Sequence, residues 1–279
     1  MTATRSSPGD DTAFFGHPTG LSTLFYTEMW ERMSYYGMRA LLVLYMTLSI
    51  QEGGLGITVA SATAIYGLYT GAVYFMGLPG GWIADRMIGC QNAIWYGGII
   101  IMCGHLLLAV PNDSTFFFGL VLVVAGTGLL KPNIGALVGQ LYPTGDERRD
   151  SGYTLYYMGI NIGSIIGYLV CGWLQVNVGY HWAFGAAAIG MGAGLVQFHL
   201  SHGKLQGHGA NPTEKLSLRN IRRTQLALVT FLVLTAGTTF LIISGSIVID
   251  PVSLAQYVAL LITAVFLGYY AAIYLFTDL

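Results

Sequence analysis

Long apolar stretches separated by short polar breaks dominate this sequence. About eight of them approach the roughly 20 residues that a helix needs to cross a bilayer, at 21–50, 58–83, 93–110, 115–141, 152–174, 182–200, 224–248 and 253–276. Only 9% of the 279 residues are charged, whereas a soluble domain carries about 25%. Because so few charges cannot form a solvated surface, we predict an all-α integral membrane protein within a lipid bilayer.

The polar segments predict how these spans are grouped. Residues 1–20 lack the apolar segment of a cleavable signal peptide, and we expect them to form a cytoplasmic tail. The longest polar break, 201–223, is expected to be a cytoplasmic linker. It would separate a six-helix bundle at 21–200 from a two-helix hairpin at 224–276.

The distribution of Lys and Arg predicts the orientation. Counted from an inside N-terminus, nine of the 12 basic residues fall on one side, namely Arg5, Arg86, Arg148, Arg149, Lys204, Lys215, Arg219, Arg222 and Arg223. The loops on the opposite side contain none. Because basic loops stay in the cytoplasm, we predict a multi-pass protein of the cell (inner) membrane with both termini cytoplasmic.

Five charged residues fall inside the predicted spans, namely Glu28, Glu31, Arg32 and Arg39 in the first and Lys131 in the fourth. A charge near the bilayer centre costs about 2.5–3.5 kcal/mol on insertion scales. Arg32 and Lys131 lie roughly 27 and 24 Å from their outer helix ends, too far to reach water, whereas Arg39, at roughly 16 Å, is close enough. We therefore predict a water-filled cavity lined by these charges.

The first span places its charges on one helix face. Residues three and four apart are neighbours on a helix, so Glu28, Glu31, Arg32, Tyr35 and Arg39 form a polar stripe. An ion network that only fixes helix packing would explain Glu28 with Arg32 but leaves Arg39 and Lys131 without partners. Two carboxylates and three cations leave one positive charge, which suits an anionic ligand group or a carboxylate from another part of the protein.

Four other segments carry weaker signals. Pro132 removes a backbone donor and is expected to kink the fourth span, which can aim Lys131 into the cavity. In the fifth span, glycines at 159, 163 and 167 predict close helix contact, while a second face carries Asn161 and several tyrosines. Tyr66, Tyr69 and Tyr74 lie in the second span, where a tyrosine grips a ligand or simply packs. Asp85 and Arg86 form either a latch on the cytoplasmic side or ordinary loop charge.

Several of these motifs resemble one known family. Glu28-x-x-Glu31-Arg32 with Tyr35-Tyr36-Gly37 resembles the first-helix signature of the proton-coupled oligopeptide transporters (the POT/PTR2 family) of the major facilitator superfamily. The Asp85-Arg86 loop, Lys131-Pro132-Asn133 and the segment from Tyr157 through Asn161 are similar to three further motifs, in the same order. The resemblance implies a major facilitator fold, of which this chain holds the N-terminal six-helix bundle and an additional hairpin. A second six-helix bundle of the same protein is then the expected partner.

The resemblance implies a proton-coupled symporter that imports di- and tripeptides by alternating access. Glu28, Glu31 and Arg32 would couple the proton, and Asp85 and Arg86 would gate the cytoplasmic side. The expected peptide-binding residues are Arg32, Tyr35, Tyr36, Arg39, Tyr74, Lys131 and Asn161. A carboxylate paired with Arg32 is stabilised in its charged form, so it accepts a proton more easily once a substrate carboxylate takes over the arginine. Proton and peptide would then bind cooperatively.

Other functions remain open at this point. A related transporter of another small anion, such as nitrate, would also use the cationic surplus, although Glu28 and Glu31 favour peptide transport. A channel or a non-transporting membrane scaffold is the alternative of a different class, but a channel more often has a symmetric ring or filter. We expect no enzyme, catalytic residue, cofactor or metal site, because neither HExxH nor a serine-nucleophile motif occurs. The net charge of −1 argues against a nucleic-acid partner.

Overall fold

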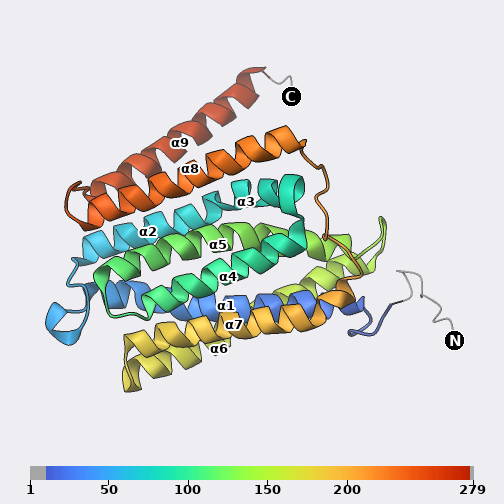
Figure 1. Cartoon of the computed structure of the whole chain (residues 1–279), viewed down its shortest axis with the longest axis horizontal. Coiled ribbons are helices and arrows are strands. Elements are labelled where there is room, and N and C mark those ends of the chain that lie inside the picture. The colour runs from blue at the N-terminus through green and yellow to red at the C-terminus, as the bar shows by residue number, and fades with distance from the viewer. Residues whose placement is uncertain (1–10, 277–279) are drawn as a thin grey trace.

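The computed structural model describes residues 11–276, and this part of the chain is all-helical, as predicted. The long helices are α1 (Thr19–Thr47), α2 (Val59–Phe75), α4 (Cys90–Leu108), α5 (Asp113–Gln140), α6 (Arg148–Asn177), α7 (Tyr180–Ser201), α8 (Leu218–Ile243) and α9 (Pro251–Phe276). The shorter elements are η1 (Ile50–Glu52), α3 (Gly77–Ile83), the π-helical turn η2 (Ala84–Ile88) and η3 (His202–Leu205). The long helices run roughly side by side, with α1, α6 and α7 at one edge and the α8–α9 hairpin at the other (Figure 1).

Seven segments among the described residues are long and apolar enough to cross a membrane. One of them is the continuous stretch Val59–Ile88, which joins α2, α3 and η2. Helix α1 has the length but is not among the seven, because Glu28, Glu31, Arg32 and Arg39 lie within it. It packs against α6 and α7, and Glu28, Glu31 and Arg32 are buried.

The predicted glycine face of α6 forms the contact with α1. Cβ atoms added at Gly159, Gly163 and Gly167 would meet the backbone carbonyl oxygens of Phe25, Met29 and Met33. All three glycines are buried. The prediction of close helix contact is therefore confirmed, and this contact holds the charged stretch of α1 against α6.

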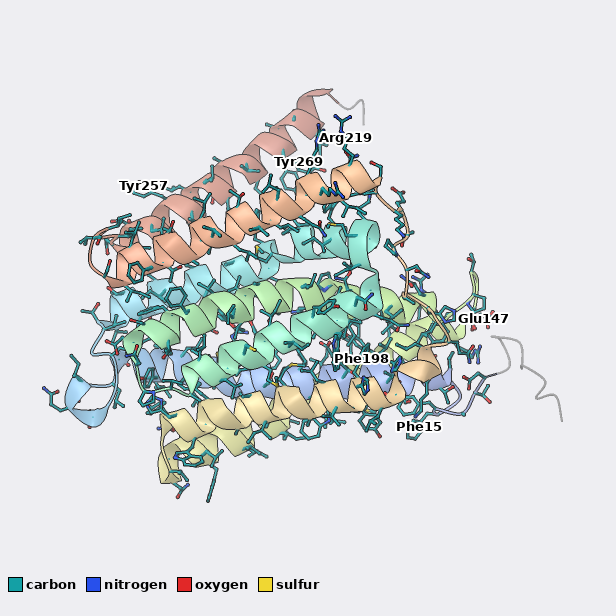
Figure 2. The ribbon with its side chains drawn as sticks, in the orientation of Figure 1. Phe15, Glu147, Phe198, Arg219, Tyr257 and Tyr269 are labelled. Carbon is teal, nitrogen blue, oxygen red and sulfur yellow. The ribbon has the colours of Figure 1, made fainter. Side chains whose placement is uncertain are left out.

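The hairpin differs from the prediction in where its first helix begins. Helix α8 starts at Leu218 rather than at residue 224, because Arg219, Arg222 and Arg223 are good helix formers although they are not apolar. Helix α9 contacts α2, and α8 contacts α5. Exposed side chains such as Tyr257 and Tyr269 cover α9 (Figure 2). The hairpin lies at one edge of the structure (Figure 1).

Candidate functional site

A buried ion cluster occupies the middle of α1. The Arg32 guanidinium donates to both carboxylate oxygens of Glu31, with Nη2 2.6 Å from Oε1. Its Nε also lies 3.2 Å from Glu28 Oε1. The Arg32 side chain is only 2% exposed, and both glutamates are fully covered. Pairing lowers the cost of burying these charges, and the predicted association of Glu28 with Arg32 is present.

Aromatic side chains surround this cluster. The Arg32 guanidinium carbon lies 4.8 Å from the centre of the Tyr35 ring and 5.9 Å from that of Tyr36. Such cation–π contacts add to the stabilisation of a desolvated guanidinium. From α6, Tyr156 places its hydroxyl against the Glu28 carboxylate. The cluster is therefore closed by tyrosines from two helices.

Arg39 lies two turns further along α1 and has a different environment. Its Nε donates to the hydroxyl of Tyr66 from α2. Its guanidinium carbon is 5.4 Å from the Tyr66 ring centre and 5.9 Å from that of Tyr35. Within residues 11–276 no carboxylate lies within ion-pair distance of Arg39, whose side chain is half-buried. Its positive charge is thus solvated by aromatic rings but not neutralised.

Lys131 on α5 is also a cation without an ion-pair partner in the described part of the chain. Its ammonium nitrogen lies 4.9 Å from the ring centre of Tyr74 on α2. Lys131 is near enough to Glu28 to interact with it electrostatically, so the two lie on the same side of the bundle. Helix α5 continues through Pro132 to Gln140.

Not every predicted site residue joins this arrangement. Asn161 is exposed on α6, and its amide donates to the backbone oxygen of Tyr157 one turn earlier. Tyr74 is 63% exposed, beside Lys131. Tyr74 and Asn161 are therefore both more exposed than the Glu28–Arg32 cluster. One common water-filled cavity stays a prediction.

The residues of the predicted latch have another partner. Arg86 does not pair with Asp85; its Nη2 lies 2.8 Å from Glu214 Oε2 of the linker. The linker backbone follows the same turn, since Glu214 N donates to Asp85 O at 3.0 Å and Leu216 N donates to Arg86 O at 3.2 Å. Residue spacing could not predict this contact, because 128 positions separate the paired charges.

Comparison with known proteins shows the family to which this chain belongs. A sequence model of the POT family matches residues 91–229. The peptide transporter YePEPT of Yersinia enterocolitica is 49% identical over 201 residues, which are 71% of this chain and 39% of that protein. A di-/tripeptide transporter of Lactococcus lactis is 44% identical over 236 residues, or 82% of this chain and 47% of that protein. The chain belongs to the POT family.

A solved structure shows the same likeness in three dimensions. The POT-family chain aligns with a crystal structure of peptide transporter POT in complex with sulfate, with a TM-score of 0.84 and 38% identity. The alignment covers 98% of this chain and 57% of the other. The chain is therefore a multi-pass membrane protein of the major facilitator type. It spans about half the length of the curated relatives it matches.

Two further tyrosines of this POT-family chain lie beside the ion cluster: Tyr156, which no sequence motif singled out, and Tyr69, for which the sequence left ligand contact and packing open. Tyr156 lies three residues before Gly159, so its contact with α1 could have been found from the spacing of the glycine face. Tyr69 lies three residues after Tyr66 and is 5% exposed. Its hydroxyl has no hydrogen-bond partner among the described residues. Spacing placed Tyr69 beside Tyr66 but could not show that its hydroxyl is unpaired.

Proposed function

We propose that this POT-family chain is the N-terminal half of a proton-coupled symporter that imports di- and tripeptides by alternating access. The observation that carries the proposal is that Arg39 and Lys131 lack ion-pair partners in the described part of the chain, close to a buried cluster of two glutamates and Arg32. Cations without partners suit a ligand that carries a carboxylate, such as the free C-terminus of a peptide. The names of the two relatives support this substrate class.

The proposed coupling uses the contacts of Arg32. In the present arrangement Arg32 engages both glutamates. A peptide carboxylate that draws the guanidinium away leaves Glu28 or Glu31 buried without its cation, and a buried carboxylate without a partner favours the protonated form. Proton and peptide thus promote each other's binding, as linkage requires. Lys131 and Arg39 would hold the peptide carboxylate while this exchange occurs.

The proposed binding pocket is completed by a second six-helix bundle. Tyr35, Tyr36, Tyr74 and Asn161 shape the half of the pocket that this chain provides. The exposure of Tyr74 and of Asn161 supports the expectation that further protein covers them. In this organisation residues 1–20 form the tail, 21–200 the bundle, 201–223 the linker and 224–276 the hairpin.

The proposed orientation places the N-terminus in the cytoplasm and the protein in the cell (inner) membrane. The linker, η2 and the α5–α6 loop lie at the same end of the molecule (Figure 1), and Arg219 and Glu147 mark that end in Figure 2. The basic residues of these segments support a cytoplasmic location for it. Asp85 and Arg86 of η2 would then belong to the cytoplasmic gate.

Uptake by the complete protein in liposomes tests this function. With an imposed inward proton gradient we expect accumulation of labelled dialanine. At least one of Glu28→Gln and Glu31→Gln should abolish gradient-driven accumulation while dialanine exchange continues, because each keeps the shape of the side chain but cannot titrate. Glu52→Gln, at an exposed position of η1, is the control and should accumulate dialanine like the unchanged protein.

Two outcomes would contradict the proposal. Accumulation of nitrate without uptake of dialanine would assign the site to another small anion. Full gradient-driven accumulation in the Glu28→Gln/Glu31→Gln double variant would show that the coupling proton does not bind to α1.

A further inference from the structure

The linker between α7 and α8 is bound to the bundle along much of its length. Near its beginning, the Gln91 side chain donates to His208 O at 2.7 Å, and Gln91 N donates to Gly209 O at 3.0 Å. Near its end, Glu214 and Leu216 donate their backbone N–H groups to the η2 turn. Between α7 and these contacts, Leu205 is fully buried in the core. The linker therefore contacts residues 84–91, here called the 84–91 turn, at two separate places: at Gln91, and at Asp85 and Arg86.

A glycine makes this close approach possible. Gly89 has φ +81°, and a Cβ added there would lie 2.7 Å from Ala210 O and 2.8 Å from Gly209 O. Gly145, in the α5–α6 loop, has φ +84° but nothing within 4 Å of such an atom. Both positions favour glycine for the backbone conformation, but only Gly89 also requires it for contact with the linker.

The ion pair of Arg86 and Glu214 has a different role from the backbone contacts. Its side chains are 40% and 67% exposed, and exposed ion pairs contribute little to stability. The backbone hydrogen bonds and the space at Gly89 therefore supply the attachment. The ion pair fixes which linker residue faces Arg86, and it turns the guanidinium toward the linker.

We infer that residues 207–216 form a brace that stays attached to the 84–91 turn throughout the transport cycle, with Glu214 as a positioning residue for Arg86. Helix α8 begins at Leu218, immediately after the last contact at Leu216. The brace therefore carries the hairpin along with the six-helix bundle as one moving body, and the flexible connection between the two halves must follow α9. This inference rests on the proposed function only in that it assigns the brace to a moving transporter.

The first test is proteolysis of the complete protein in detergent, which does not depend on transport. Trypsin cleaves after Lys215, which is exposed next to Glu214. We expect Gly89→Ala to accelerate cleavage after Lys215 several-fold, because the added carbon displaces the linker. Gly145→Ala introduces a comparable backbone strain without a contact and should leave the cleavage rate unchanged. Equal cleavage rates in Gly89→Ala and the unchanged protein would overturn the attachment.

The second test asks whether the brace must detach. Gln91→Cys and His208→Cys, at the first attachment point and away from Asp85 and Arg86, are combined with Cys103→Ser, which removes the exposed cysteine among the described residues. The pair is then joined by a short bifunctional methanethiosulfonate reagent. Dialanine accumulation in liposomes should be the same before and after joining, and a several-fold loss that reduction reverses would overturn the inference. If the unchanged protein does not transport dialanine, the proposed function is refuted. The proteolysis result still decides whether the linker is attached.

Discussion

The contact between α1 and α6 can be tested by adding one carbon atom. Alanine at Gly163 would place its Cβ against the carbonyl oxygen of Met29, 3.0 Å from the carbonyl carbon and 3.1 Å from Arg32 Cβ. The carbonyl belongs to the α1 backbone, so it cannot rotate away as a side chain would. The substitution must therefore displace α1 from α6 at the level of the ion cluster.

The expected magnitude follows from two opposing effects. In a helix interior, alanine is more favourable than glycine by about 0.5–1 kcal/mol. At Gly172, on the same helix and with nothing within 4 Å, only this gain applies. At Gly163, overpacking costs about 1–3 kcal/mol. Because the contact is with backbone, the upper part of this range, about 2–3 kcal/mol, applies. We therefore expect Gly163→Ala to lower the free energy of unfolding by about 1–2.5 kcal/mol and Gly172→Ala to raise it slightly.

Thermal unfolding of the complete protein in detergent measures this difference. The Tm of Gly163→Ala should fall below that of the unchanged protein, whereas the Tm of Gly172→Ala should equal or exceed it. Dialanine uptake should fall with the first variant only, because Arg32 shifts with α1. Equal Tm values for the two variants would refute the register of α1 on α6.

Three further predictions concern single side chains. Tyr69→Phe should leave the free energy of unfolding unchanged or raise it by up to about 1 kcal/mol, because the hydroxyl that it removes has no hydrogen-bond partner among the described residues. Thermal unfolding measures this, and a clear loss of stability would mean that the hydroxyl is paired. Hydrogen bonds from Arg148 hold the pKa of Asp146 below its ordinary value of 3.8, so their stabilisation is complete above that value and is lost as the pH falls through the lowered pKa. Asp146→Asn should remove this part of the acid dependence of Tm, and an unchanged profile below pH 4 would contradict it. Lys131→Ala should raise the KM for dialanine more than the KM for dialanine amide in uptake assays, since it removes a cation that in the proposed function faces the peptide carboxylate. Equal increases would show that Lys131 does not recognise the carboxylate.

Helix-level features were predictable because they depend on local spacing. The apolar stretches predicted the membrane-spanning helices, and the glycines at 159, 163 and 167 predicted the face of α6 that contacts α1. Likewise, the positions of Glu28 and Arg32 one turn apart predicted their ion pair. Each of these inferences needs only the helical repeat, which fixes the residues that share a face.

Contacts between distant segments were not predictable in the same way. Arg86 pairs with Glu214 because the linker folds back onto η2, and no spacing rule connects those positions. Lys131 faces the ring of Tyr74 because of how α5 lies against α2. The start of α8 was missed because a helix can begin with exposed arginines outside the apolar stretch. These features depend on packing rather than on periodicity.

The division of the charges into two environments gives a physical reason for coupling in the proposed mechanism. Both carboxylates lie buried with Arg32, while Arg39 and Lys131 lie against tyrosine rings and have no ion-pair partner within residues 11–276. A peptide carboxylate that arrives at these two cations also approaches Glu28 and Glu31, and like charges in a desolvated site repel strongly. A proton on either glutamate removes one of the opposing charges and strengthens the attraction to the cations. Peptide binding is then favoured by protonation even without a change in shape, and by reciprocity the bound peptide favours the proton.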